Sequence, residues 1–221
     1  MIKFPENKSK RKSDETECSL KAAVNAGMVA LGQRYMIEGN PVTCVDIDGN
    51  KYIFSMDEIF KCAPHKEIPS ILRQIYETGK IDDKEILPVS MMKDIDFLFV
   101  PCERQVFGQN KYGDEKKELG IKQFEWYKRG DVVRIKGYRG KDNSYWEDGE
   151  TCHWWLATVN SGNSTNCCNV NNNGNANNNN ASNTNIGVPV CFMWYKSTDK
   201  VSYVQIQYHG QQTEIRRFII E

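Results

Sequence analysis

Apolar and polar positions separate most sharply in the second half of the chain, where two apolar segments bracket a polar run. Trp154-Trp155-Leu156 precedes the run, residues 188–194 follow it, and asparagine dominates between them. Tryptophan and valine pack well in a core, whereas every buried asparagine amide needs hydrogen-bond partners. The pattern therefore predicts two core strands that hold an exposed, amide-rich surface between them. Disordered or aggregation-prone tracts can have the same composition, so a floppy insert is the alternative.

Shorter alternating patterns predict strands elsewhere. Residues 35–60 have the pattern of a β-hairpin, with Asp48-Gly49-Asn50 as its turn. Residues 96–100 and 132–135 are short apolar runs typical of buried strands. Residues 201–208 and 213–220 predict a terminal hairpin around His209-Gly210.

Helical spacing appears in three places. Apolar residues recur from Leu20 to Leu31, behind a capping pair formed by Asp14 and Glu17, so a helix is expected to end near Gly32. A second helix is expected over residues 68–76, with Pro69 in its first turn and an end signal at Gly79, and a brief one over residues 121–127. Residues 108–120 and 137–149 read as polar loops. Short strands, few helices and long loops together predict an α+β fold.

Three regions follow from this reading. Residues 1–31 form a polar tail and an accessory helix, residues 32–195 the main domain, and residues 196–221 a C-terminal β-hairpin extension. The tail carries a basic cluster around Lys10, which is more typical of a solvated terminus than of a binding arm. The accessory helix or the hairpin is where we expect contacts with another subunit, if the protein is an oligomer.

Charge and hydropathy exclude several classes of partner. Lys and Arg total 29, Asp and Glu total 29, and the formal net charge is zero, so no overall field favours nucleic acid. No apolar run approaches membrane-spanning length, and we expect no membrane insertion. The first residues lack the apolar segment of a secretion signal, which favours a cytoplasmic or virion-associated protein.

The residues that could do chemistry are scattered. Eight cysteines without a paired-knuckle spacing read as reduced, buried thiols, and Cys62 with His65 or Cys152 with His153 supplies only half a zinc site. No nucleophile motif surrounds the histidines. We therefore expect no catalytic residues, no metal and no cofactor.

The central motifs resemble a known family. The strand Trp154-Trp155-Leu156-Ala157-Thr158, the Asn-rich segments 169–175 and 181–186, and the closing Gly187-Val188-Pro189 are similar to the C-type-lectin-fold variable proteins of diversity-generating retroelements. The resemblance covers residues 32–194. It departs from the family at Val188-Pro189, because the family's closing motif more often has Arg between these two residues.

The resemblance implies a binding protein with a C-type-lectin-like fold and a variable region over about residues 155–190. Retroelement mutagenesis alters adenines, and asparagine codons carry adenine at both positions that determine the amino acid. The implied ligand is a protein or a glycan. The implied ligand-binding residues are Asn160, Asn163, Asn166, Asn169, Asn171, Asn173, Asn175, Asn177, Asn179, Asn183 and Asn185.

Other functions on the same fold fit less well. Formylglycine-generating oxidases share the fold, but their Gly-Gly-Ser-Trp-type signature is absent, and Cys152 with Cys191 is a loose substitute for their paired cysteines. Calcium-dependent sugar binding needs clustered carboxylates, and residues 160–185 contain no Asp or Glu. A non-diversified structural or interaction domain of a phage or bacterium stays open as an alternative.

Overall fold

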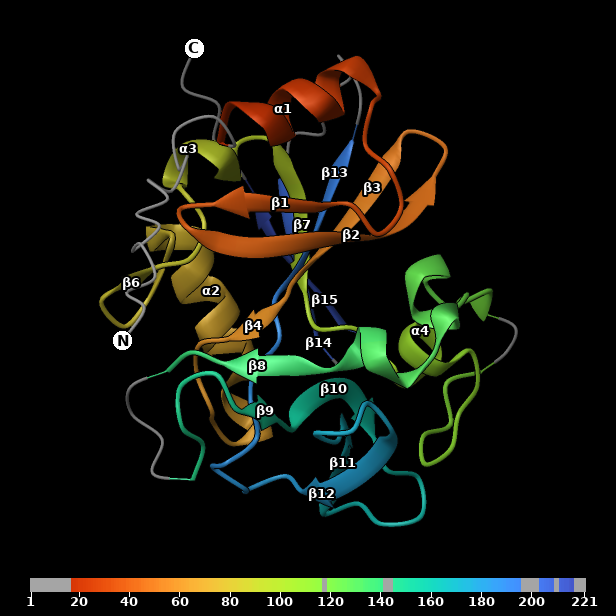
Figure 1. The fold of residues 1–221 in the computed structure, drawn as a ribbon. Coiled ribbons are helices and arrows are strands. Elements are labelled where there is room, and N and C mark those ends of the chain that lie inside the picture. Colours follow the sequence, from red (N-terminus) through yellow and green to blue (C-terminus); the bar gives the residue numbers. More distant parts are fainter. Residues whose placement is uncertain (1–16, 117–118, 141–144, 196–202, 209–210, 217–221) are drawn as a thin grey trace, which may run out of the picture.

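The computed structural model describes residues 17–116, 119–140, 145–195, 203–208 and 211–216. The basic cluster around Lys10 and the predicted cap at Asp14 lie outside these residues. Within the described part, the element pattern is α+β, as the sequence predicts: short helices accompany one large sheet and several small ones (Figure 1). No helix among the described residues is long and apolar enough to cross a membrane.

The large sheet has seven strands in the order β1-β2-β3-β13-β7-β14-β15. Every neighbouring pair is antiparallel except β7 and β14, which are parallel. The predicted hairpins at Asp48-Gly49-Asn50 and near the C-terminus are confirmed, and the second one continues the large sheet. The strand bounds are β1 (Arg34–Ile37), β2 (Asn40–Asp48), β3 (Lys51–Met56), β7 (Ile95–Phe99), β13 (Cys191–Tyr195), β14 (Tyr203–Tyr208) and β15 (Gln211–Arg216).

The sheet separates two apolar cores because side chains alternate along its strands. On β3, Phe54 and Met56 enter the larger core, while Ile53 enters the smaller one. On β13, Phe192 and Cys191 divide in the same way. The larger core also holds the buried faces of α1 and α2. The smaller core lies on the other side, which is where the candidate sites are built.

The helices are short and end at recognisable signals. In α2, Pro69 occupies the first turn and Gly79, with φ of 73°, ends the helix, as predicted. In α1, Gly27 already has φ of 68°, so the helix ends at Ala26 rather than near Gly32, and Met28 is 74% exposed. The helices are α1 (Glu17–Ala26), α2 (Ile68–Thr78), α3 (Val89–Met92) and α4 (Glu103–Phe107), with 3₁₀ turns η1 (His65–Glu67), η3 (Glu125–Arg129) and η4 (Asp131–Arg134).

The predicted strand over residues 132–135 is wrong, because this segment forms η4. Arg134 holds the turn: its Nη1 donates to Asp131 Oδ1 at 2.7 Å and its Nη2 to the Tyr127 carbonyl at 2.7 Å. Val132 is 81% exposed, so the apolar run does not mark a buried strand. The brief helix expected over residues 121–127 is likewise a 3₁₀ turn that starts later, at Glu125.

Small sheets complete the fold. The strands β10 (Trp154–Val159), β11 (Asn166–Val170) and β12 (Ala176–Asn180) form a sheet in that order, drawn at the lower end of Figure 1, away from α1. The strands β4 (Glu58–Ile59), β8 (Lys136–Tyr138) and β9 (Thr151–Cys152) form a second, and β5 (Lys80–Ile81) with β6 (Lys84–Glu85) a third.

Candidate functional site

The strand β10 anchors the candidate surface, because it is buried on both faces. Trp155 enters the larger core and Trp154 the smaller one, and both are fully buried. Each indole also satisfies its polar group: Trp155 Nε1 donates to the Ala63 carbonyl at 2.8 Å, and Trp154 Nε1 to the Arg134 carbonyl at 2.9 Å. Burial of two hydrogen-bonded indoles makes β10 a fixed platform for the strands beside it.

The next strand, β11, carries this burial into the Asn-rich run. Cys167 packs in the larger core and Cys168 in the smaller one, and neither forms a disulfide. Burial raises the pKa of Cys167 to about 11 and that of Cys168 further, so both stay protonated thiols at neutral pH. The prediction of free, buried thiols is thus confirmed for the adjacent pair.

The third strand, β12, is the edge of the sheet and consists of Ala176 followed by asparagines. Its backbone pairs with β11 along the whole strand, from Asn166 opposite Asn180 to Val170 opposite Ala176. The central run is therefore ordered, but the expectation that residues 160–185 are exposed throughout is wrong. Residues 167–170 are buried, because β11 lies between β10 and β12.

Several asparagines in the run close turns with their own side chains. In each case an Oδ1 accepts the backbone N–H of the residue two positions further along, which is the geometry of an Asx turn. Asn171 Oδ1 accepts the N–H of Asn173 in this way at 3.0 Å and also accepts the N–H of Asn175, four positions along, at 2.9 Å. The turn-closing residues are Asn160, Asn163, Asn171, Asn180 and Asn183.

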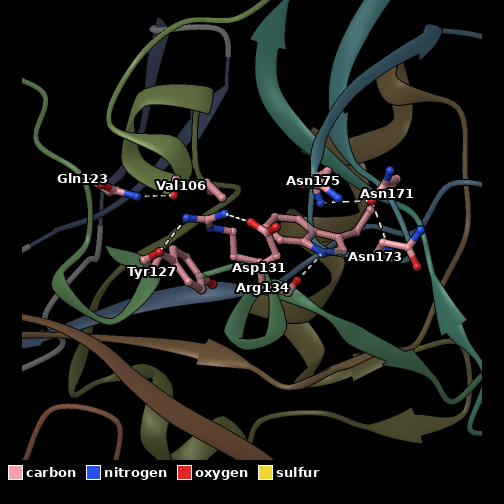
Figure 2. A network of polar contacts seen from close by, with 9 residues as sticks. Val106, Gln123, Tyr127, Asp131, Arg134, Asn171, Asn173 and Asn175 are labelled. Carbon is pink, nitrogen blue, oxygen red and sulfur yellow. Dashed lines mark hydrogen bonds and ion pairs between the residues drawn. The ribbon is translucent and has the colours of Figure 1, made fainter. Parts of the chain in front are cut away.

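The turn between β11 and β12 is also fixed by its contact with η4. Gly174 has φ of 81°, and a Cβ on it would lie 2.1 Å from the Asp131 carbonyl oxygen, so only glycine fits there. Figure 2 shows the ion pair of Arg134 with Asp131 near the hydrogen bonds that the Asn171 side chain accepts from Asn173 and Asn175. The backbone of this turn is thus fixed at Gly174, and substitutions can change only the side chains of the other turn residues.

One predicted ligand-binding residue is inside the protein. Asn169 is fully buried on β11, opposite Asn177, and neither its Oδ1 nor its Nδ2 has a hydrogen-bond partner in the described part of the chain. Such an amide loses its hydration without compensation. The exposed-surface prediction is wrong for Asn169, because the register of β11 turns its side chain inward.

The remaining predicted residues lie on β11, on the edge strand β12 and in the turns next to them. Amide pairs join Asn166 Nδ2 to Asn178 Oδ1 at 2.7 Å and Asn183 Nδ2 to Asn179 Oδ1 at 3.3 Å. By contrast, Asn173, Asn175 and Asn177 make no side-chain hydrogen bond to other described residues. These three open amides are the ones most available to a ligand.

An aromatic group beside this edge was not expected from the sequence. Tyr145 is 62% exposed and meets Trp146 edge to face at 4.7 Å between ring centroids, and Trp146 lies 5.6 Å from the His153 ring. Trp146 Nε1 donates to the Asn185 carbonyl at 2.6 Å, and the His153 ring hydrogen-bonds the Asn172 side chain. We call these five residues the amide–aromatic surface. In the sequence, the adjacent aromatic residues Tyr145 and Trp146 in an otherwise polar loop were the signal from which this surface could have been predicted.

The structure gives little basis for metal or thiol chemistry. Among the described residues no group of three or more His, Cys, Asp or Glu side chains could hold a metal ion. Cys152 and Cys191 are both buried, and burial raises the pKa of each thiol well above its usual value. His65 is buried as well, with Nε2 2.7 Å from the Leu156 carbonyl oxygen and its ring against Trp155.

Comparison with known proteins gives one match. A family model described as a domain of unknown function (DUF6273) matches residues 93–195, from just before β7 to the end of β13. The matched segment contains the whole β10-β11-β12 sheet and the amide–aromatic surface. No curated protein matches the chain. No solved structure matches it either.

Proposed function

We propose that this chain is a ligand-binding protein, a receptor or adhesion module that displays a diversifiable Asn-rich surface on a C-type-lectin-like scaffold. The observation that carries the proposal is the contrast inside one small sheet. The strand β10, buried from Trp154 to Thr158, is joined through β11 to an edge strand made almost entirely of asparagine. Edge strands usually carry charged residues or prolines, which prevent pairing with another chain. An edge strand lined with neutral amides is suited to meeting a partner.

The chemistry of the surface fits a protein or a glycan. Each amide offers two N–H donors and one carbonyl acceptor, so it can match peptide groups and sugar hydroxyls alike. Tyr145 and Trp146 add aromatic area next to the amides, a combination that antibody loops also use for adaptable recognition. Residues 157–192 contain no charged side chain, so selectivity on this surface comes from hydrogen bonding and shape.

The turn-closing amides divide the run into fixed and variable positions, and this division makes the proposal testable. A library randomised at Asn173, Asn175 and Asn177 is expected to yield mostly folded protein whose binding to panels of glycans and cell-surface proteins differs from member to member. A matched library at Asn160, Asn171 and Asn180 is expected to yield far fewer folded members. If the first library folds but no member gains or loses a ligand, the surface is not the binding site.

Diversification has a separate test in the DNA around the gene. A nearby partial copy of the segment that encodes about residues 155–190, differing from it only where the copy carries adenine, is expected. Such a copy would predict natural variants that change at Asn codons and keep Gly174 and β10. If the locus lacks such a copy and the Asn codons are invariant in other isolates, the protein is a ligand-binding domain that is not diversified.

A further inference from the structure

A second candidate site lies away from the small sheet, in a cavity of about 750 Å³ between the large sheet and the segment from η3 to β8. This volume suits a small molecule. Ser55 of β3, Tyr127 of η3 and Lys136 of β8 all line it. These residues lie far apart in the sequence, and the fold brings their polar groups together at one point.

The meeting point is the Ser55 hydroxyl. Lys136 Nζ lies 2.8 Å from Ser55 Oγ, Tyr127 OH donates to the same oxygen at 3.3 Å, and Cys191 Sγ at 3.4 Å. The Ser55 hydroxyl itself can donate to the Met56 carbonyl at 3.4 Å. When the Ser55 proton points to Lys136, Tyr127 and Cys191 remain as two donors, and they match the two lone pairs of the serine oxygen. As Ser55 loses its proton, these two donors would stabilise the negative charge that develops on Oγ.

Lys136 is placed to take the proton. It is 4% exposed, and Nζ also donates to the Met56 carbonyl. Burial lowers the pKa of its ammonium group, while Cys191, Asp57 and Cys152 oppose the shift. The Trp154 ring lies 5.4 Å from Nζ on the remaining side. A neutral amine has a lone pair that can accept the Ser55 proton at hydrogen-bond distance, which is the geometry required of a general base.

The rest of the cavity indicates an uncharged ligand. Arg34 pairs with Asp57 at 2.6 Å and Arg139 with Glu58 at 2.9 Å, so both arginines at its wall are neutralised, and Asp148 adds a further carboxylate to the lining. Trp126 and Ile135 contribute apolar lining. An anionic ligand would have to displace an ion pair and would face the Asp148 carboxylate, whereas a neutral ester would leave both ion pairs intact.

We propose that this cavity is an acyl-transfer site for small uncharged esters or thioesters, with Ser55 as nucleophile and Lys136 as general base. Ser55 Oγ forms a bond to the acyl carbon as its proton passes to Lys136 Nζ. The bond from that carbon to the leaving oxygen or sulfur then breaks, and the leaving group takes the proton from Nζ. Water releases the acyl group as a carboxylic acid and restores the Ser55 hydroxyl.

The test uses the full chain and a fluorophosphonate probe, which bonds covalently to activated serine hydroxyls. The expected result is one adduct per chain by intact mass, mapped to Ser55 by peptide sequencing. Its rate should rise with pH through a midpoint below the ordinary lysine value of 10.5, because only the neutral amine acts as a base. Hydrolysis of p-nitrophenyl acetate should follow the same pH profile.

Variants separate this role from a structural one. Lys136→Met should slow labelling by about 10²–10⁴-fold, the usual contribution of a general base, and Ser55→Ala should abolish it. The matched control is Ser70→Ala, which removes an exposed serine in α2 that bonds the Glu67 carbonyl and should label at the wild-type rate. If Ser55→Ala fails to fold, mapping of the wild-type adduct still decides. No adduct at Ser55, or a Lys136→Met variant that labels as fast as wild type, overturns the proposal.

Discussion

The strands β10 and β12 belong to the same three-stranded sheet and have opposite characters. In β10 the side chains from Trp154 to Ala157 are buried in two cores, and the indoles of Trp154 and Trp155 are fully covered. In β12 asparagines fill an edge that pairs only with β11. The pairing of β12 with β11 runs without interruption, whereas the pairing of β10 with β11 has an irregularity between Trp155 and Val159. The comparison indicates that β12 takes its geometry from backbone pairing, whereas β10 takes it from side-chain burial.

This difference separates stability from recognition. Replacing a side chain in β10 removes core contacts, while replacing one in β12 leaves the ladder of backbone hydrogen bonds intact. The turn-closing asparagines are an intermediate class, since their side chains replace backbone partners. The loss in free energy of unfolding should therefore be largest for substitutions in β10, intermediate at the turn-closing asparagines and smallest at the open asparagines of β12.

The largest effect is expected for Trp155→Ala. Truncation of a buried aromatic residue costs about 3–5 kcal/mol, and the Ala63 carbonyl would lose its donor as well. The loss should appear as a large fall in the urea midpoint, or as failure to fold. The control is Tyr145→Ala, because Tyr145 is 62% exposed and should leave the midpoint nearly unchanged. A Trp155→Ala protein with the wild-type melting temperature would show that β10 is not the anchor.

A gain in stability is expected for Asn169→Leu. The amide of Asn169 is buried without a partner, which costs about 1–3 kcal/mol, and leucine has a similar shape without polar atoms. Denaturant unfolding should report a higher free energy of unfolding for the leucine variant and a much lower one for Asn169→Asp, which buries a charge. A destabilised leucine variant would mean that a buried water satisfies the amide.

A moderate loss is expected for Asn171→Ala. Its Oδ1 accepts two backbone N–H groups, and each hydrogen bond contributes about 0.5–1.5 kcal/mol. The matched variant is Asn173→Ala in the same turn. The Asn173 side chain makes no hydrogen bond to another described residue, so this variant removes an amide without breaking a bond. Equal melting temperatures for the two variants would remove the distinction between turn-closing and open amides.

A smaller, pH-dependent effect is expected at His153, beside the edge. Burial lowers the pKa of its ring, and the hydrogen bond of the ring to the Asn172 side chain opposes this shift. Between that lowered pKa and 6.5 the unfolded chain binds the proton more readily, so the His153 contribution to stability falls as pH falls through this window. Burial raises the pKa of the Asp46, Glu58 and Glu115 carboxyls, and these act in the opposite sense.

Because these carboxyls also change stability with pH, the effect of His153 is measured as the difference in stability between two proteins. Stability of wild type and of His153→Gln is compared by urea unfolding at several pH values between 5 and 8, a range chosen around the histidine pKa of about 6.5. The variant should lose less stability on acidification than wild type. Parallel curves for the two proteins would show that His153 titrates alike in the folded and unfolded states.

The sequence predicted those elements whose signals are local. The β2–β3 hairpin follows from Asp48-Gly49-Asn50, and α2 follows from Pro69 and Gly79, because each signal acts through the conformation of its own residues. The α+β class follows from the same local patterns. The apolar run at 132–135 misled, because the hydrogen bonds of Arg134 to Asp131 and Tyr127 depend on the surrounding fold.

The candidate surface was predicted in position but only partly in form. The apolar segments on either side correctly located an ordered, Asn-rich region. Asparagine has a low strand propensity, so β12 could not be recognised until β11 was seen to pair with it. The register of that pairing also decides that Asn169 is buried. Trp146 and His153 join the surface only through contacts between distant segments.

The smallest effect is expected for Asn177→Thr on β12. Asn177 lies opposite Asn169 and its amide bonds no other described residue, so its removal breaks no recorded hydrogen bond. Threonine favours strands more than asparagine does, and a change of this kind at a partly exposed position usually stays within about 0.5 kcal/mol. The melting temperatures of Asn177→Thr and wild type should therefore agree closely, with any shift upward.

The same substitution at Asn180, whose Oδ1 accepts the Ser182 N–H at 2.9 Å, should lower the melting temperature. Two changes of one residue type on one strand would then differ in sign, because only one of the two amides closes a turn. A large loss at Asn177 would instead mean that β12 depends on its side chains, as β10 does, and that the edge is not free to vary.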